Sequence, residues 1–249
     1  MAVHLYGVST AGAAPPEDIR GRADAPLRLI SDDDLAVLVS DIDADAPAGR
    51  KDLLLHAHVL EAWVEKHTVV PMRFGILLED DDAVRRSLLD NDRESLLSHV
   101  QRFEGLVQLS VQAFHHEEPA LREVLRRHPE LVRLREEIAG RPPEATQAQQ
   151  IQLGEAVASE LQRLQDEDAA YLLDRLVPHA VDVAQEEAHG QHQVLHAAFL
   201  VRRDNRKEFD EAVGTLRAQI EQSIRLRYVG PQPPYSFLDA VTTGEQTWA

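Results

Sequence analysis

The feature that most constrains the fold of this chain is a proline-rich tract near the end of the sequence, directly after a strand-like segment. It reads Gly230-Pro231-Gln232-Pro233-Pro234-Tyr235-Ser236-Phe237. Each proline lacks the backbone N–H that a sheet ladder needs, so we expect the last strand to end here and a stiff, extended arm to follow. An extended chain places Tyr235 and Phe237 on one side. We expect the arm to dock on the protein's own surface; the alternative is an aromatic anchor for a partner.

Composition excludes several classes of function. The chain has 249 residues, of which 26 are basic and 43 acidic, giving a formal net charge of −17. Nucleic acids and anionic lipid surfaces both select basic residues, so this charge argues against either partner. The chain has no cysteine, which excludes disulfides, thiolate catalysis and zinc–cysteine sites. We see no signal peptide and no 18-residue apolar run, and we expect a cytoplasmic protein.

Hydrophobic periodicity predicts mixed helices and strands. In the first half it predicts helices at about 50–66 and 80–103, and strands at 3–8, 27–30, 35–40, 69–76 and 107–113. In the second half it predicts strands at 193–201 and 223–229, and helices at 117–127, 129–139, 145–175 and about 205–220. This order favours helices on one face of an antiparallel sheet in each half, which is the α+β class. We expect an N-terminal α+β domain at 1–115 and a C-terminal α+β domain at 116–249, the latter with a helical insertion and an extended proline-rich tail.

Patterns that carry chemistry are scarce. The sequence contains no HExxH, no Gly-x-Ser-x-Gly and no glycine-rich phosphate loop. His56 and His67 flank Trp63 on one face of the helix at 50–66, which is typical of packing histidines. The segment 115–118, His-His-Glu-Glu, has metal-ligand residue types but lies at a strand-to-helix junction. We therefore expect no catalytic residue, no cofactor and no metal.

The acidic triplets have a simpler interpretation than cation binding. Asp32–Asp34 lies between two predicted strands and Asp80–Asp82 at the start of a predicted helix. We expect a turn and a helix start respectively, because aspartate favours turns and the positive end of the helix dipole.

Arg73 stands out because it lies inside an apolar strand-like segment, opposite Met72 and Phe74. A buried arginine needs a partner charge, so we expect an ion pair with a carboxylate of the same domain. The alternative is an arginine that is offered to a partner surface.

Four segments stand out in the order Tyr6-Gly7-Val8, Val70-Pro71-Met72-Arg73-Phe74-Gly75, Phe103-Glu104-Gly105-Leu106-Val107-Gln108-Leu109-Ser110-Val111, and the tract at 230–237. Together, over nearly the whole chain, they resemble the gas vesicle protein family GvpF/GvpL. The chain departs from the family pattern at Gln232, where an aromatic residue is expected, and at Gln108, where the family often has an acidic residue.

The resemblance implies an accessory or minor structural protein of gas vesicle assembly that is not an enzyme. It implies two α+β domains, the first a ferredoxin-like variant. The implied partners are the small hydrophobic shell protein and other accessory proteins. The implied location is the gas vesicle, some members lying on the gas-facing side of the shell, after a cytoplasmic stage.

Our candidates for partner contacts are Arg73, Phe74, Tyr235 and Phe237. Two alternatives remain open from the residues alone. One is a metal-dependent hydrolase with an unrecognised His/carboxylate site, which requires polar groups that converge in one pocket. The other is a module that senses a small ligand.

Overall fold

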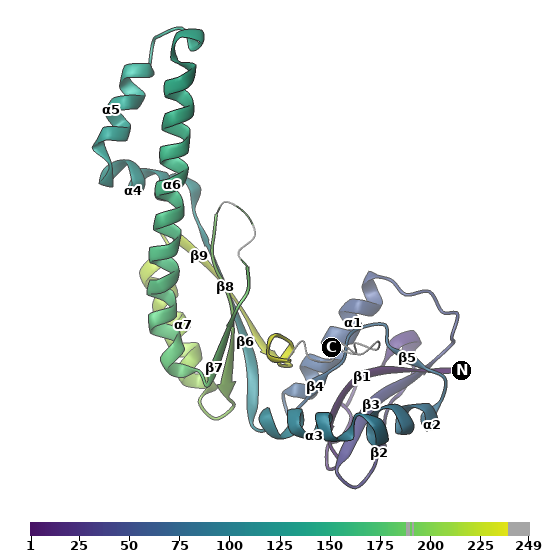
Figure 1. The fold of residues 1–249 in the computed structure, drawn as a ribbon. Coiled ribbons are helices and arrows are strands. Elements are labelled where there is room, and N and C mark those ends of the chain that lie inside the picture. Colours follow the sequence, from purple (N-terminus) through teal and green to yellow (C-terminus); the bar gives the residue numbers. More distant parts are fainter. Residues whose placement is uncertain (188–189, 191, 239–249) are drawn as a thin grey trace. The chain divides into compact units, whose positions relative to one another are not determined.

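The computed structural model describes residues 1–187, 190 and 192–238 (Figure 1). Helices and sheets are both present, and the α+β class predicted from the sequence is confirmed. The contacts divide the chain into two units. The first unit contains Met1–Leu109, Phe199–Arg206 and the chain from Val229 onward, and the second contains Ser110–Ala198 and Lys207–Tyr228.

The first unit is built on a five-stranded antiparallel sheet in the order β2-β3-β1-β4, with β5 also paired to β1. Its strands are β1 Ala2–Thr10, β2 Leu27–Ser31, β3 Leu35–Ile42, β4 Val70–Pro71 and β5 Leu77–Leu78. β1 is buried along nearly its whole length because strands flank it on both sides. A Cβ atom at Gly7 would lie only 2.8 Å from the carbonyl oxygen of Val70, so the pairing of β1 with β4 requires glycine there.

The helices of the first unit are α1 Arg50–Val64, α2 Asp81–Val84, the π-helical η2 Arg85–Asn91 and α3 Arg93–Arg102. A short 3-10 turn, η1 Arg22–Asp24, lies between β1 and β2. Both α1 and α3 pack against β1. Trp63 and Phe103, from these two helical regions, are among the largest fully buried side chains of the core.

The strand predicted at 69–76 is wrong in its middle. β4 ends at Pro71 and β5 begins at Leu77, and the chain between them turns at Phe74 and Gly75. Gly75 has a φ of +98°, a conformation that favours glycine and that a continuous strand cannot contain. Alternating apolar residues therefore predicted the buried start of this segment but not the turn that follows it.

The predicted roles of the two acidic triplets are confirmed. Asp32 accepts hydrogen bonds from the backbone N–H groups of Asp34 and Leu35, at 2.8 and 2.7 Å, in the turn between β2 and β3. Asp80 caps α2 by accepting from the backbone N–H of Ala83 at 2.8 Å.

The second sheet has the order β7-β8-β6-β9. Its strands are β6 Leu106–His115, β7 Asp182–Gln185, β8 Gln193–Arg202 and β9 Ile224–Gln232. β8 lies in the interior of the sheet and is buried on both faces, as predicted. β9 is longer than predicted, because it continues through Pro231. The missing N–H of a proline is tolerated there since β9 is an edge strand with a neighbour on one side only.

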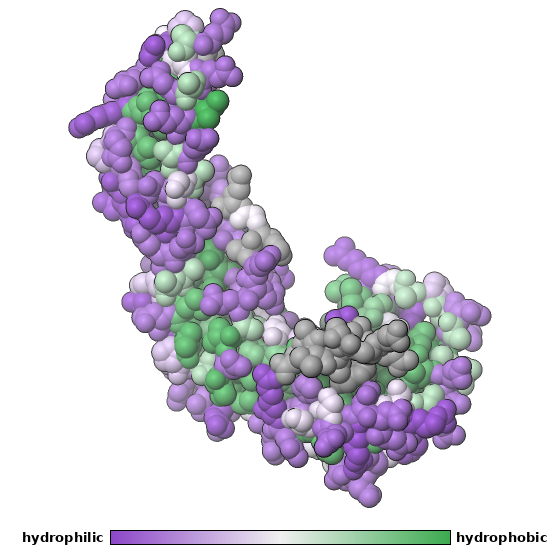
Figure 2. Space-filling view, viewed as in Figure 1, coloured by the Kyte–Doolittle hydropathy of each residue, from purple (hydrophilic) through white to green (hydrophobic). Residues whose placement is uncertain are grey.

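Helices α4 Glu117–Arg127, α5 Pro129–Ile138 and α6 Pro143–Leu176 form the predicted helical insertion. They share a small apolar cluster made of Ala120, Val124, Leu131 and Leu164. Figure 1 shows α4 and α5 alongside α6, and Figure 2 shows that hydrophilic residues cover most of the visible face of this segment. The turn η3 Val177–His179 follows α6, and α7 Arg206–Ile220 precedes β9. Within the described residues, no helix combines the length and the apolar character needed to cross a bilayer.

Two statements about domains stay predictions. The division at residue 115 is a single cut, whereas the contact units are each assembled from separate stretches of the chain. The ferredoxin-like variant also stays a prediction, because that motif begins β-α-β and the connection from β1 to β2 here carries only η1.

Candidate functional site

The four residues predicted to meet a partner all lie in the first unit, but they differ in exposure. Arg73 is exposed, Phe74 is half-buried and Tyr235 is 40% exposed, whereas Phe237 is only 5% exposed. Arg73, Phe74 and Tyr235 therefore supply accessible surface. Phe237 is an internal anchor.

The arm docks on its own unit, as predicted, but by a different geometry. It ends in a 3-10 turn, η4 Tyr235–Phe237, so Tyr235 and Phe237 do not share the side of an extended chain. The backbone N–H of Ser236 donates to Oε1 of Gln108 at 3.0 Å, and the Tyr235 hydroxyl donates to the carbonyl oxygen of Met72 at 3.3 Å. The side-chain amide oxygen of Gln108 is therefore the acceptor that holds the backbone of the arm.

The start of the arm lies very close to β6. A Cβ atom at Gly230 would lie 2.5 Å from Cδ2 of Leu109 and 3.1 Å from the carbonyl oxygen of Gln108. No side chain fits there without displacing its neighbours. The glycine before Pro231 thus permits the close approach that brings the arm to the turn at Phe74.

The expected ion pair of Arg73 is not found. Because the turn at 73–76 replaces a strand, the side chain is exposed and needs no buried counter-charge. No residue among those that the structure describes forms a hydrogen bond or an ion pair with the Arg73 guanidinium. The alternative from the sequence, an arginine offered to a partner, is the one that this geometry favours.

Two buried histidines, His4 and His56, contact the residues of this turn. Nε2 of His56 lies 2.9 Å from the carbonyl oxygen of Met72, and Nδ1 of His56 lies 3.1 Å from Nε2 of His4. A carbonyl only accepts, so His56 donates through Nε2 and its Nδ1 accepts from His4. The ring of Phe74 packs edge-on against both imidazoles at 5.7 Å, and the Arg22 guanidinium lies 5.9 Å from the same ring.

Burial favours the neutral form of both rings. Burial, then the neighbouring His56 and Arg22, lowers the pKa of His4 to about 3. Burial also lowers the pKa of His56, against a smaller opposing effect of the Met72 carbonyl. The predicted packing role of His56 is confirmed, but its link to His4 has no signal in the sequence, because 52 residues separate the two.

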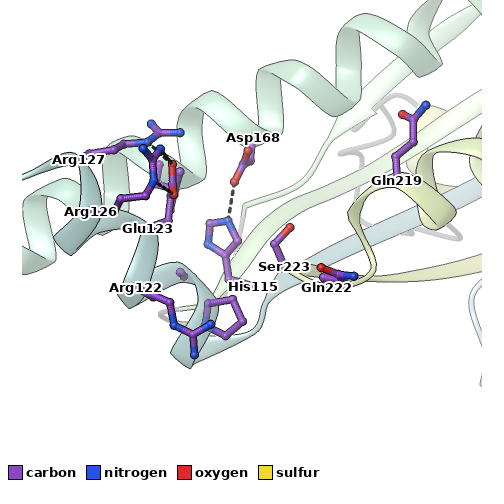
Figure 3. Close-up of a pocket in the computed structure, with 12 residues that line it drawn as sticks. His115, Arg122, Glu123, Arg126, Arg127, Asp168, Gln219, Gln222 and Ser223 are labelled. Carbon is purple, nitrogen blue, oxygen red and sulfur yellow. Dashed lines mark hydrogen bonds and ion pairs between the residues drawn. The ribbon is translucent and has the colours of Figure 1, made fainter.

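The second unit contains a cavity of about 510 Å³ (Figure 3). Its wall carries His115 from the end of β6, whose Nε2 lies 2.7 Å from Oδ2 of Asp168 on α6. Arg126 and Arg127 both bond to Glu123 at 2.7 Å on the same wall. His115 pairs with Asp168, and the two arginines pair with Glu123, so these polar groups already have partners within the wall. Figure 3 shows His115 and Asp168 pointing toward each other rather than into open space.

The remaining polar residues do not assemble into a metal site. His116 of the His-His-Glu-Glu segment lies with Nε2 3.2 Å from the carbonyl oxygen of Glu221, away from the His115–Asp168 pair. In the part of the chain that the structure describes, no three His, Cys, Asp or Glu side chains are placed to hold one ion. The Ser223 hydroxyl, also on the cavity wall, donates to the carbonyl oxygen of Ile220 at 3.2 Å.

Solved structures share this fold. The crystal structure of the gas vesicle protein GvpF from Anabaena sp. PCC7120 matches with a TM-score of 0.83 at 23% identity, covering 96% of this chain and 98% of that one. The crystal structure of GvpF from Microcystis aeruginosa matches with a TM-score of 0.76 at 22% identity, covering 95% and 98%.

Sequence comparisons give the same family. Gas vesicle protein F of Streptomyces sp. (strain CB03234) is 35% identical over 96% of this chain and 100% of its own length. Gas vesicle protein F of Dolichospermum flosaquae is 22% identical over 95% and 97%. The family model described as gas vesicle synthesis protein GvpL/GvpF matches residues 2–239. Because that match spans nearly the whole chain, the protein belongs to the GvpL/GvpF family of gas vesicle synthesis proteins.

Proposed function

We propose that this protein is an accessory protein of gas vesicle assembly that binds the small hydrophobic shell protein and other accessory proteins. Membership in the GvpL/GvpF family supports the role in assembly. We further propose that it acts by contact rather than by catalysis, and that it reaches the gas vesicle after a cytoplasmic stage, with the gas-facing side of the shell as its final location.

The observation that carries the binding proposal is the surface formed by Arg73, Phe74 and Tyr235, which we call the turn–arm surface. An exposed guanidinium with no ion pair among the described residues lies on the same turn as a half-buried ring, and the turn contacts a second, partly exposed ring. Arginine and tyrosine are enriched among the residues that dominate binding energy at protein interfaces.

The turn–arm surface is also held in place before any partner arrives. His56 and Tyr235 both bond to the carbonyl oxygen of Met72, at 2.9 and 3.3 Å, and Phe237 is buried behind them. A surface that is already ordered loses less conformational entropy on binding, so more of the contact energy remains as affinity.

Co-purification tests the proposal. An affinity-tagged copy of this chain is co-expressed with the shell protein, and the shell protein retained per tagged chain is measured. We expect the wild type to retain the shell protein and Arg73→Ala to retain at least fivefold less. Arg86→Ala is the matched control, because Arg86 is another exposed arginine of the same unit with no hydrogen bond or ion pair among the described residues.

If Arg73→Ala and Arg86→Ala retained equal amounts of shell protein, the turn–arm surface would not be the binding surface. Failure of the wild type to retain any shell protein would overturn the proposed partner. In cells that carry a gas vesicle gene set without this gene, the wild type should restore vesicles visible by electron microscopy, and Arg73→Ala should restore fewer.

A further inference from the structure

A groove runs between helix α1 and the start of the arm. Its volume is about 280 Å³, and all of its walls belong to the first unit. One wall is the outer face of α1 and the other is the end of β9. The groove is lined by His58, Glu61, Ala62, Glu65, Val229, Gly230 and Pro231.

The two carboxylates of the groove differ in their partners. Glu65 lies 3.4 Å from Nη1 of Arg206, within its own unit. Glu61 is half-buried, yet its carboxylate has no hydrogen bond or ion pair to any residue that the structure describes. A partly desolvated carboxylate without a partner favours a cation from outside the chain.

The negative charge of Glu61 also acts on the arm, at Tyr235. Burial of the hydroxyl, and after it the negative charge of Glu61, raises the pKa of Tyr235. The charge of Glu61 therefore reaches the ring that forms part of the turn–arm surface.

We propose that this groove takes the side chain of a lysine or arginine from a partner protein, with the charged end at Glu61 and the aliphatic stem along Ala62 and Pro231. Long basic side chains suit such a site because their methylene groups bury apolar area while the charge stays at the rim. This inference rests on the proposed function for the identity of the first partner to test, the shell protein. It adds that the partner segment carries a basic residue beside apolar ones.

The composition of the chain argues for an occupant from outside. The segment that follows the described arm, residues 239–249, contains Asp239 and Glu245 and no lysine or arginine, so it cannot supply the cation. A second copy of this chain would bring another net charge of −17, which opposes self-association at this acidic groove. A partner with a basic segment is attracted by the same charge.

A fragment titration tests the groove without any partner. The probe is n-butylguanidinium, added to the full chain and followed by amide NMR shifts, with n-butanol as the neutral control. We expect saturable shifts at Glu61, Ala62 and Gly230 with n-butylguanidinium, and at least fivefold weaker binding to Glu61→Gln. Glu79→Gln, which changes an exposed glutamate elsewhere in the unit, should bind the probe as the wild type does. Absence of saturable shifts, or equal binding to Glu61→Gln, would overturn the inference.

Co-purification with the shell protein separates this inference from the proposed function. We expect Glu61→Gln to retain at least fivefold less shell protein than the wild type, Glu61→Asp to recover part of the loss, and Glu79→Gln to retain the wild-type amount. If Glu61→Gln retained as much shell protein as the wild type, the groove would not be a recognition site, and the proposed function would be unaffected. If the wild type retains no shell protein, the proposed function fails, and the fragment titration still decides whether the groove binds a basic side chain.

Discussion

Arg203 donates a hydrogen bond from Nη1 to the backbone carbonyl oxygen of Val64, the last residue of α1, at 2.6 Å. The same guanidinium reaches the carbonyl oxygens of Glu65 at 2.8 Å and His67 at 3.1 Å. The last carbonyls of a helix have no partner within the helix and carry partial negative charge. An arginine that follows β8 in the sequence therefore closes the C-terminus of a helix 138 or more residues earlier.

Removal of this cap should destabilise the first unit. We expect Arg203→Ala to lower the free energy of unfolding by about 2 kcal/mol, because charged hydrogen bonds to three carbonyls are lost at a helix C-terminus. Urea denaturation measures the change. Arg202→Ala is the control, since Arg202 is exposed at the end of β8 and should change the midpoint little. Equal midpoints for the two variants would contradict the capping role.

Truncation of two arginines of the first unit should reduce stability to different extents. Arg28 bonds to Asp41 and Asp81, each at 2.6 Å from Nη2, and both bonds are partly buried. We expect Arg28→Ala to cost about 1–2 kcal/mol of stability, and Arg73→Ala, which removes an exposed and unpaired group, less than about 0.5 kcal/mol. The midpoints of denaturant unfolding measure both losses. If Arg73→Ala lost more stability than Arg28→Ala, the ion pair of Arg73 that the sequence predicted would be supported after all.

The arm should contribute to stability mainly through Phe237. Its ring is 5% exposed, so we expect Phe237→Ala to cost about 3 kcal/mol as a buried aromatic side chain is replaced by a cavity. Tyr235→Phe keeps the ring and removes only the 3.3 Å bond to Met72, which should cost less than about 1 kcal/mol. Thermal melting compares the stability of the two variants with that of the wild type. A variant that lacks residues 230–249 should show the largest fall in melting temperature. A deletion variant that melts like the wild type would rule out docking.

Acid should destabilise the first unit through His4. The pKa of His4 is held at about 3 in the folded protein and is 6.5 without burial, so the unfolded chain binds a proton that the folded chain does not. The free energy of unfolding therefore keeps its full value above pH 6.5. It falls as the pH drops from 6.5 toward 3, by about 1.4 kcal/mol per pH unit for one such group.

NMR titration of the His4 ring checks the cause directly. The ring should stay neutral at pH 5. In parallel, His4→Asn should flatten the fall of the urea midpoint between pH 7 and pH 5. Protonation of His4 above pH 6 in the folded state would refute the shift and the stability change that follows from it.

The sequence predicted most elements because their burial is periodic. The alternation in 107–113 and 193–201, and the helical spacing of apolar residues in 50–66 and 206–220, each correspond to an observed strand or helix. Two of its errors share a cause. At 69–76 the local rule for strands missed a turn, and at 230–232 the local rule for prolines ended a strand too early, because the turn at Gly75 and the edge position of β9 are set by the folded sheets.

The candidate site was predictable only in part. The segment with Arg73 and Phe74, predicted as a strand, and the arm with Tyr235 and Phe237 were identified separately as candidates for partner contacts. Their meeting at the carbonyl of Met72, and the buried His4–His56 pair beneath it, join residues from distant parts of the chain. Spacing in a sequence carries no information about contacts over such separations.

By itself the sequence determined the α+β class, the acidic character, the order of the elements and the family. These follow from side-chain period, composition and ordered motifs, which are local or additive properties of the chain. Tertiary structure alone decided that Arg73 is exposed, that Phe237 is buried while Tyr235 is partly exposed, and that Glu61, in a groove that Pro231 also lines, has no hydrogen-bond or ion-pair partner among the described residues. Exposure and pairing depend on which distant segments come to lie against each residue, and only the folded chain fixes that.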